Sequence, residues 1–434
     1  MADAVSDSGR PLARDGALSR NRIREELPNQ PGVIAWWRTS GNWGRAGCIP
    51  KVVRYTVPGV EIKAEIPVKK KRIISSFILA VTFVAFVIAL GVLRPEPLQA
   101  QANPPKYEVD PYWPKPLPDA WVTGELGTVC VDARDHVLVL NRRKLTDHEL
   151  EAGRQAPPVI EFDRDGNVVN SWGDPNLLPK LLHGCSFDRD GNLWIGGGWG
   201  GMVQKYTHDG SKLLLQIGRK DVYDSSDGTS NGRALNSSHT LLFKPAAIAV
   251  DPSNGDVYIA DGYGNSRVAV FDRNGGFLHQ WGRQGTKAEV EAGVGGVFML
   301  VVHCLSIGND GLVYVCDRQG DRLQVFDKMG NFRRNIQIRT DSPQLPDESG
   351  TVVWMDFSPD PAQKYIYIVN QHNEEVDIID HASGQIVGRF GRAGHQLGEF
   401  NHAHSLAVDS KGNVFVAEVV GGQRVQKFKI VGSQ

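Results

Sequence analysis

The sequence predicts an all-β protein in which residues 103–434 form a six-bladed β-propeller. One phrase recurs along this region: a short apolar run, a turn of Asp, Asn and Gly residues, and a second apolar run. Each copy belongs to a unit of roughly 50 to 60 residues with four such runs, which is typical of a propeller blade. Period-2 alternation in runs such as 257–260 favours strands over helices.

The six copies of the phrase define six units, which begin at or near Val129, His183, Ala246, His303, Trp354 and His404. In each unit a third run ends near an aromatic residue and a charged turn, as in 268–276 and 323–331. A fourth run often closes in Trp-Gly or Phe-Gly, as in 168–173, 277–282 and 386–391. We therefore expect four strands in each unit.

The sixth unit has strands at 404–408, 414–418 and 424–430 but no fourth run before Gln434. The extended, aromatic segment 107–113 precedes the first unit and can supply the missing strand. Pairing the first and last segments in this way leaves no exposed sheet edge.

The residues before the propeller carry the features of an export signal. A basic run, 69–72, precedes an uninterrupted apolar stretch, 73–93, that is long enough to cross a bilayer. Small residues at Ala100 and Ala102 follow, as at the cleavage site of a secretory signal peptide. We predict a signal peptide or membrane anchor at 68–102, with the propeller exported, because lysines beside a span stay in the cytoplasm.

Residues 1–67 carry Pro, Gly, Trp and scattered arginines without periodicity, and we predict no domain there. They are either a disordered cytoplasmic tail or a mis-assigned extension, with translation starting near Val68. The exported propeller is then extracytoplasmic, as a periplasmic or secreted protein, or as one anchored to the membrane through 73–93.

The composition excludes a strong electrostatic field, because 48 Lys and Arg residues nearly balance 49 Asp and Glu residues. This balance and the lack of a recognisable motif indicate no nucleic-acid partner. A closed propeller of this size needs no partner for stability, so we expect a monomer. The segment from Lys220 to Phe243 is rich in Ser, Asn and Gly and predicts a loop over one face, which gates substrate or binds a partner.

Four of the five cysteines fall in predicted strands, with Cys130, Cys185 and Cys304 in first strands and Cys316 in a second. An exported protein can form disulfides, but no close framework spacing is evident. We interpret these cysteines as small buried residues of the inner strands, not as disulfides or thiolate ligands.

His183, His303 and His404 occupy the same place in three copies of the phrase. Equivalent positions of successive blades converge on the propeller axis, so histidines distant in sequence become neighbours. Three imidazoles with an open position form a catalytic zinc arrangement, in which zinc acts as a Lewis acid or lowers the pKa of a bound water or hydroxyl. The alternative is that the histidines fill a register position of a degenerate repeat.

Two further phrases follow the second strands of their units: Asp-Gly-Tyr-Gly-Asn-Ser-Arg-Val-Ala-Val-Phe at 261–271 and Asp-Arg-Gln-Gly-Asp-Arg-Leu-Gln-Val-Phe at 317–326. Together with the three histidines, they resemble the catalytic segments of peptidyl-α-hydroxyglycine α-amidating lyase. That family is a six-bladed propeller related to NHL-repeat proteins and holds zinc by three histidines. The resemblance covers residues 103–434 and implies the same fold and a peptide or small-molecule substrate.

The resemblance implies that the three histidines bind zinc and that Tyr263 deprotonates a substrate hydroxyl. Arg318 matches the arginine beside that tyrosine, and Arg142 falls at the position of a second active-site arginine. A phenolate near zinc and guanidinium groups has a lowered pKa, so we expect Tyr263 to act as a base near neutral pH. Arg142 or Arg318 can clamp a carboxylate. In the family reaction a carbon–nitrogen bond breaks and glyoxylate leaves a peptide amide behind.

The chain departs from the family at Ser405, where the family carries an acidic residue that contributes to a structural calcium. Backbone carbonyls near Val129 and Cys185 can still line such a site, but a hydroxyl replaces the charge that a hard cation prefers. The sequence therefore argues against calcium. Residues 1–67 are also too short and irregular to form the monooxygenase that makes the hydroxyglycine substrate.

Three functions remain open. The first is a zinc lyase or hydrolase that acts on a hydroxylated, carboxylate-bearing substrate such as a peptidyl-α-hydroxyglycine. The second is a non-catalytic NHL-type propeller that binds a protein or glycan outside the membrane. The third is a lactonase-type hydrolase, although such sites hold calcium with carboxylates and the channel positions here are histidines.

Overall fold

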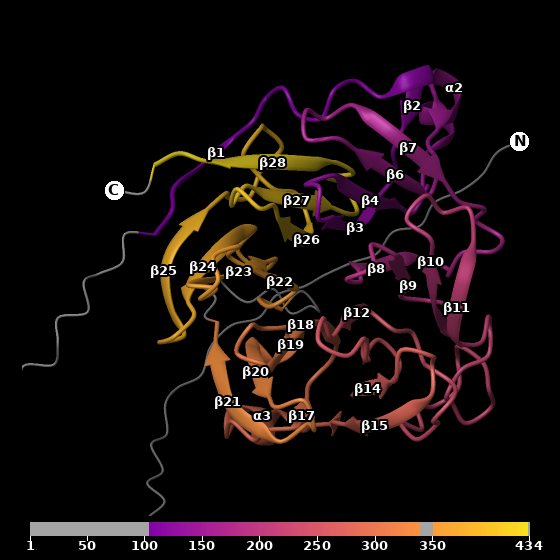
Figure 1. Cartoon of the computed structure of the whole chain (residues 1–434), viewed down its shortest axis with the longest axis vertical. Helices are drawn as coiled ribbons and strands as arrows, with labels where there is room; N and C mark the ends of the chain where they lie inside the picture. The colour runs from indigo at the N-terminus through magenta and orange to yellow at the C-terminus, as the bar shows by residue number, and fades with distance from the viewer. Residues whose placement is uncertain (1–103, 339–349, 433–434) are drawn as a thin grey trace, which may run out of the picture. The chain divides into compact units, whose positions relative to one another are not determined.

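The computed structural model describes residues 104–338 and 350–432, which all lie within one compact unit, Pro95–Gln434. These residues form six four-stranded sheets arranged around an axis (Figure 1). Neighbouring strands within each sheet are antiparallel. The predicted all-β, six-bladed propeller is confirmed.

The first three blades follow one another along the chain, and each begins with its innermost strand. Blade 1 contains β3 (Leu126–Val131), β4 (Val137–Asn141), β6 (Val159–Phe162) and β7 (Val168–Trp172). Blade 2 contains β8 (Leu182–Phe187), β9 (Leu193–Gly197), β10 (Met202–Tyr206) and β11 (Leu213–Gly218). Blade 3 contains β12 (Ala247–Val250), β13 (Val257–Asp261), β14 (Arg267–Phe271) and β15 (Phe277–Trp281).

The last three blades repeat this order. Blade 4 contains β18 (Val302–Ile307), β19 (Val313–Asp317), β20 (Arg322–Phe326) and β21 (Phe332–Gln337). Blade 5 contains β22 (Trp354–Phe357), β23 (Tyr365–Asn370), β24 (Glu375–Asp380) and β25 (Gln385–Phe390). Blade 6 contains β26 (Ala403–Val408), β27 (Val414–Glu418), β28 (Val425–Ile430) and β1 (Tyr107–Val109).

Short elements decorate the loops between strands. Two parallel pairs are β2 (Trp121–Val122) with β5 (Arg154–Gln155), and β16 (Arg283–Gln284) with β17 (Val297–Phe298). The helices are α2 (Asp147–Ala152), α3 (Lys287–Glu291) and the 3-10 turns η1 (Pro118–Ala120) and η2 (Arg318–Gly320). Both α-helices begin with a capping box, formed by Thr146 with Glu149 and by Thr286 with Glu289, which satisfies free backbone donors of the first turn.

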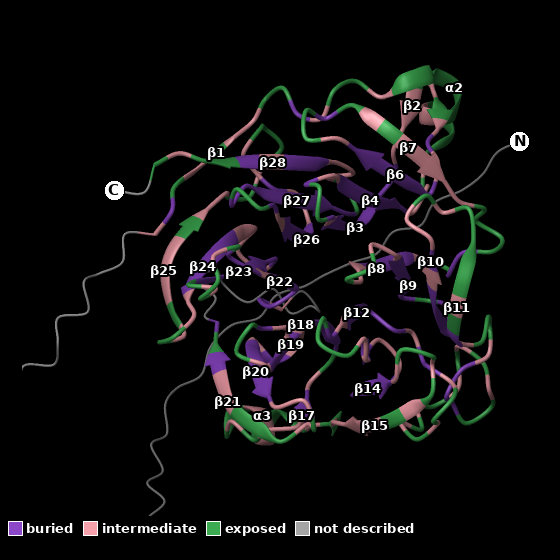
Figure 2. Ribbon diagram, viewed as in Figure 1, coloured by how far each residue is buried: buried purple, intermediate pink, exposed green. Residues whose placement is uncertain are grey.

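The innermost strands form a closed ring in the order β3, β8, β12, β18, β22, β26 and back to β3. They and the second and third strands are largely buried, whereas the outermost strands carry exposed residues (Figure 2). The hydrophobic core therefore lies between neighbouring blades, and the first residues of the inner strands converge near the axis.

The ring closes as predicted, because β1 pairs with β28 and completes blade 6. Tyr107 lies opposite Ile430 and Val109 opposite Phe428. The Tyr107 hydroxyl also lies 2.7 Å from the Tyr367 hydroxyl of blade 5. Residues from both ends of the propeller thus share one sheet, which removes an unpaired edge.

The aromatic residues that close the fourth strands pack onto the next blade. The Trp172 ring of β7 covers Gly210 in the β10–β11 turn, where an added Cβ would lie 2.1 Å from Trp172 Cδ2. Gly210 also has a φ of 73°, a conformation that glycine adopts without strain. Trp281 covers Gly330 of blade 4 in the same way. This contact gives the tryptophan that recurs at the end of the fourth strand a packing role.

The interpretation of the cysteines as unpaired was wrong, although all four are buried. Cys130 of β3 and Cys185 of β8 form a disulfide between blades 1 and 2, and Cys304 of β18 bonds Cys316 of β19 within blade 4. The first pair meets because inner strands of neighbouring blades lie side by side. The second faces across an antiparallel hairpin, where the sequence separation of 12 spans one turn.

The predicted tail at 1–67 and the predicted signal or anchor at 68–102, including the apolar stretch 73–93, lie outside the described residues. Among the helices that the structure does describe, none is long and apolar enough to cross a membrane. The predicted loop from Lys220 to Phe243 is present, with two isolated bridges, Arg219 to Val222 and Ser225 to Ala234.

Candidate metal centre and active site

The three histidines sit at one register position of alternate blades. Each is the second residue of an inner strand: His183 of β8, His303 of β18 and His404 of β26. Each also lies five residues before the residue whose backbone N–H closes the following hairpin turn, at Asp188, Gly308 and Asp409. The repeat therefore delivers one imidazole from each of blades 2, 4 and 6 to the same level of the axis.

The same position in blades 1, 3 and 5 holds Gly127, Ala246 and Val353, and their backbone carbonyls orient the histidines. His183 Nδ1 lies 2.8 Å from Ala246 O, His303 Nδ1 2.6 Å from Val353 O, and His404 Nδ1 2.8 Å from Gly127 O. A carbonyl only accepts, so each Nδ1 carries the proton and each Nε2 presents a lone pair. This is the tautomer that binds a metal through Nε2.

The three imidazoles are buried and neutral. His183 and His303 are fully buried and His404 is 4% exposed. Burial holds the pKa of each well below its usual range, and neighbouring positive groups, including Arg142 for His183 and Arg318 for His303, lower it further. Protonation therefore does not compete with metal binding near neutral pH.

The ligand atoms of the three histidines lie within 4.8 Å of one another, which is close enough to surround one ion. Their ring centroids are 4.6 to 5.1 Å apart. Three neutral imidazoles with fixed tautomers fit a divalent transition metal that keeps an open position. The arrangement can hold such an ion with carbonyl partners already in place behind each ligand.

Tyr263 lies against this group, on the loop after β13. Its hydroxyl is 3.0 Å from His183 Nε2 and 2.8 Å from His303 Nε2. The loop is held by Asp261, which accepts from the Phe243 N–H at 2.7 Å and pairs with the buried Arg267 at 3.0 Å. The segment that ends at Phe243 thus packs against the Tyr263 loop. Both lie at the end of the propeller axis that holds the three histidines, and we call this axial region the channel.

The electrostatics of Tyr263 differ from the expectation. Burial raises the pKa of the Tyr263 hydroxyl, and the positive charges of Arg318 and Arg142 offset only part of that increase. The protein groups alone therefore do not lower this pKa, because the cost of charging a buried phenol exceeds the attraction of the two guanidinium groups.

The two predicted arginines both lie near Tyr263 but are held differently. The guanidinium of Arg318, in η2, lies 5.9 Å from the Tyr263 ring centre. Arg142 donates from Nε to Leu182 O at 2.9 Å and pairs through Nη1 with Glu125 at 3.0 Å. Two of the three guanidinium nitrogens of Arg142 are therefore engaged, which leaves it less suited than expected to a bidentate clamp.

The residues considered for a second cation were named for their backbone carbonyls, and the contacts that the structure gives them involve other atoms. The Val129 N–H donates to the Ser405 hydroxyl at 3.0 Å, and Cys185 is bonded to Cys130. This hydrogen bond joins inner strand β26 to β3, and Ser405 is fully buried. The hydroxyl that replaces an acidic residue has a structural partner of its own.

Three residues beside the site were not predicted. Glu125 anchors Arg142, and its pKa is below the usual range because hydrogen bonds from Lys144 and Arg142 outweigh the effect of burial, which raises it. The Trp354 ring lies 6.3 Å from the rings of both His183 and His303. No repeat position marked either residue, although Trp354 opens the most divergent copy of the phrase.

The third residue, Trp199, is 49% exposed and stands within the glycine-rich run 196–201. Its neighbour Gly198 lines the site, since a Cβ there would lie 3.2 Å from His183 Cδ2 and 3.6 Å from the Tyr263 ring. Lys244 Nζ lies 4.0 Å from the Trp199 ring centre. An aromatic residue amid glycines was the signal that could have identified it.

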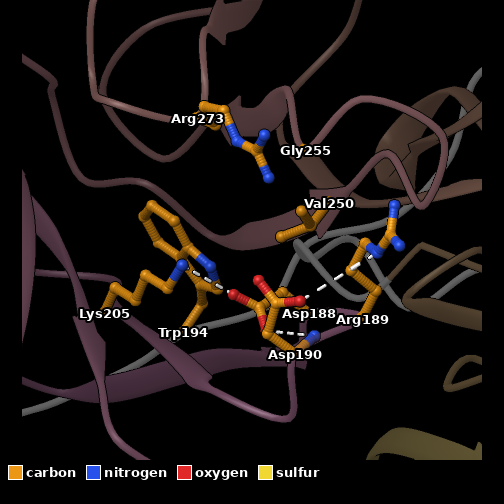
Figure 3. A pocket seen from close by; sticks show the side chains of 8 residues that line it. All are labelled: Asp188, Arg189, Asp190, Trp194, Lys205, Val250, Gly255 and Arg273. Atoms are coloured by element: carbon orange, nitrogen blue, oxygen red, sulfur yellow. Dashed lines mark hydrogen bonds and ion pairs between the residues drawn. The ribbon is translucent and has the colours of Figure 1, made fainter.

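A separate depression lies between blades 2 and 3, lined by Asp188, Arg189, Lys205 and Arg273 among others (Figure 3). Lys205 pairs there with Asp188 at 2.7 Å. Asp188 belongs to the turn after β8, at the opposite end of that strand from His183. This depression contains none of the predicted site residues.

Comparisons with known proteins agree with the predicted repeat. The NHL repeat family matches residues 244–271 and 400–428. Human NHL repeat-containing protein 3 is 25% identical over 331 residues, which cover 74% of this chain and 84% of that protein. A probable peptidyl-alpha-hydroxyglycine alpha-amidating lyase of Caenorhabditis elegans is 25% identical over 312 residues, covering 68% of this chain and 80% of the relative.

Peptidyl-glycine alpha-amidating monooxygenase B of Xenopus laevis is 31% identical over 184 residues, which cover 42% of this chain but only 19% of that longer protein. The similarity to the lyases and the matches to the repeat support the same conclusion. The chain is a six-bladed propeller with two segments that match the NHL repeat, and it resembles the peptidyl-alpha-hydroxyglycine alpha-amidating lyases.

Proposed function

We propose that the protein is a zinc-dependent lyase that cleaves a peptidyl-α-hydroxyglycine or a closely related hydroxylated, carboxylate-bearing substrate. The observation that carries the proposal is the meeting of three neutral, tautomer-fixed imidazoles with the Tyr263 hydroxyl, beside Arg318. The likeness to relatives named amidating lyases supports the same reaction class.

His183, His303 and His404 are the residues that would hold zinc. A bound zinc ion would supply Lewis acidity toward the substrate hydroxyl, which lowers the pKa of that hydroxyl. Because its ligands are neutral, the ion would keep its full positive charge in a buried site. That charge favours a substrate which develops negative charge on oxygen.

The remaining steps belong to protein side chains. We assign Tyr263 Oη to move the hydroxyl proton as the carbon–oxygen double bond forms. The carbon–nitrogen bond breaks, its electron pair goes to nitrogen, and nitrogen takes up a proton, so the products are a peptide amide and glyoxylate. Arg318 would orient the substrate carboxylate, with Arg142 adding positive charge. Trp199 would contact the peptide part outside the channel.

We further propose that the propeller works outside the cytoplasm as a monomer. Two disulfides support an oxidising compartment, because such bonds persist mainly in exported proteins. Fractionation of the producing cells, with peptide mapping of the mature N-terminus, tests this assignment and the position of any cleavage. Recovery of a reduced protein from the cytoplasm would contradict it.

The test of the reaction is glyoxylate release from a synthetic α-hydroxyglycyl peptide by the full chain, before and after chelation and zinc re-addition. Zinc-dependent release that is lost in His303→Ala is the expected outcome. A folded, zinc-loaded protein that releases no glyoxylate contradicts a peptidyl-α-hydroxyglycine lyase. That outcome favours the alternative, a non-catalytic propeller like a binding module, for which the match to an NHL repeat-containing protein is the supporting observation.

A further inference from the structure

Four side chains of metal-binding type meet where blades 1 and 2 adjoin, away from the channel. Asp132 and His136 flank the β3–β4 turn, Glu161 lies in β6, and His208 lies in the β10–β11 turn; we call these four the turn-side cluster. The ligand atoms of the first three lie within 4.8 Å of one another. His208 Nε2 lies 3.1 Å from Glu161 Oε1 and 3.6 Å from Asp132 Oδ2.

The turn-side cluster lies at the far end of the inner strand from the channel histidines. In blade 1 the channel position is Gly127 and the turn begins at Asp132, five residues later. At the rise of a β-strand, this separation is roughly 16 Å. The cluster is therefore distinct from the candidate active site.

Asp132 and His208 are held in place by backbone groups. Asp132 Oδ1 accepts the backbone N–H groups of Arg134 and His136, both at 2.8 Å, which leaves Oδ2 directed at the cluster. His208 Nδ1 lies 3.1 Å from Gly191 O, and its ring stacks on Phe187 at 5.2 Å. The tautomer with its proton on Nδ1 presents the Nε2 lone pair of His208 to the carboxylates, which is the geometry of a metal ligand.

This arrangement favours a cation between the carboxylates. The side chains of Asp132 and Glu161 are 5% and 4% exposed, and two buried carboxylates facing a lone pair repel one another. Arg134 Nη2 fills the point of convergence, at 2.8 Å from Asp132 Oδ2, 3.2 Å from Glu161 Oε1 and 2.5 Å from His208 Nε2. The Arg134 side chain is 58% exposed, so it can swing into solvent.

We propose that the turn-side cluster is a second metal site, which binds a divalent transition ion such as zinc in place of the Arg134 guanidinium. Two carboxylates and two imidazoles complete a four-coordinate shell, which is typical of a structural site. Three ligands come from blade 1 and His208 comes from blade 2. The ion would therefore join these two blades, next to the Cys130–Cys185 disulfide that also joins them.

Zinc stoichiometry of the full chain tests this proposal without any activity measurement. After equilibration with zinc and removal of excess, we expect wild type to hold two equivalents and His208→Ala one, by elemental mass spectrometry. The double variant His303→Ala/His404→Ala should retain the equivalent that His208→Ala loses. His279→Ala is the matched control and should hold both zinc equivalents. His279 lies on the outer strand β15, where its Nε2 contacts the Lys328 carbonyl.

Arg134→Gln gives an independent measurement, because it removes the competing cation and leaves the four ligands intact. We expect its zinc dissociation constant at this site to fall about tenfold, since zinc no longer has to displace a resident group. Two results overturn the proposal: wild type and His208→Ala binding the same number of zinc ions, or Arg134→Gln leaving zinc affinity unchanged. Either would make Arg134 a permanent member of an ion-pair network.

Discussion

The channel histidines and the turn-side cluster orient imidazoles with the same device and surround them with opposite charge. For the channel histidines and for His208, a backbone carbonyl accepts from Nδ1 and turns Nε2 toward the centre, whereas His136 faces Glu161 Oε1 through Nδ1 at 2.8 Å. The channel set consists of neutral imidazoles near two arginines, whereas the turn-side cluster adds two buried carboxylates. A divalent ion bound by the channel histidines would keep its positive charge and could attract a negatively charged substrate. A divalent ion in the turn-side cluster would be neutralised by the two carboxylates.

One inner strand can therefore contribute to two kinds of site. The start of the inner strand faces the axis, where six equivalent positions converge. Its end enters a turn, where neighbouring blades meet in pairs. Where several blades converge, their side chains can surround a substrate, which suits catalysis. Where only two blades meet, side chains from both can bind one ion, which suits a structural link between the blades.

Substituting one imidazole at each site in turn should give the largest difference in activity between two variants. His303→Ala should abolish zinc-dependent glyoxylate release, because two imidazoles hold the ion poorly and in the wrong geometry. His208→Ala should keep wild-type kcat/KM, since His208 lies in the β10–β11 turn, away from the channel histidines. Circular dichroism first shows that both variants fold, and steady-state kinetics then measures their kcat/KM. Equal loss in both variants would remove the functional distinction between the two places.

A second variant separates metal binding from proton movement within the channel. Tyr263→Phe removes one hydroxyl that lies 2.8 Å from His303 Nε2 and leaves the three ligands intact. We expect kcat to fall by roughly 10² to 10⁴, the usual contribution of a general acid or base. Zinc content should stay at the wild-type value. A variant that loses zinc, or one that keeps full kcat, is incompatible with the assigned role.

The channel side of the molecule could largely be predicted from the sequence. The phrase recurs with a constant spacing of five residues from histidine to turn, so the amino-acid sequence alone aligns His183, His303 and His404. Counting five residues back from the same turn in blades 1, 3 and 5 gives Gly127, Ala246 and Val353, whose carbonyls hold the histidines. The repeat therefore encodes both the ligands and their partners.

The rest depends on contacts between blades, which the repeat does not encode. Cys130 and Cys185 are 55 residues apart and meet only because β3 and β8 are neighbours in the ring. Cys304 and Cys316 flank one hairpin, so that pair could have been predicted from the strands already assigned. The turn-side cluster draws on turns whose Asp and His residues look like ordinary loop composition.

A third, smaller effect concerns the joint between blades 1 and 2. Replacing Cys130 and Cys185 by alanine should lower the free energy of unfolding by about 2–4 kcal/mol, the usual contribution of a disulfide. If zinc joins the same blades, the loss should be larger without zinc than with it, because neighbouring links couple. Denaturant unfolding with and without zinc measures this. The Cys304→Ala/Cys316→Ala variant is the control, and its loss should not depend on zinc at the turn-side cluster.

A substitution beside the channel, at a position with no counterpart in the turn-side cluster, should have the smallest effect on the kinetics. Trp199 is 49% exposed and adjoins Gly198, which lines the site. If its ring contacts the peptide part of the substrate, Trp199→Ala should raise KM about 2- to 10-fold with kcat unchanged, since an aromatic contact contributes about 0.5–1.5 kcal/mol. Met329→Ala, an equally apolar change at an exposed turn of blade 4, should leave KM as it is. Because Lys244 lies over the Trp199 ring, a KM effect confined to peptides with an apolar residue before the hydroxyglycine would assign the contact to the ring and not to the lysine.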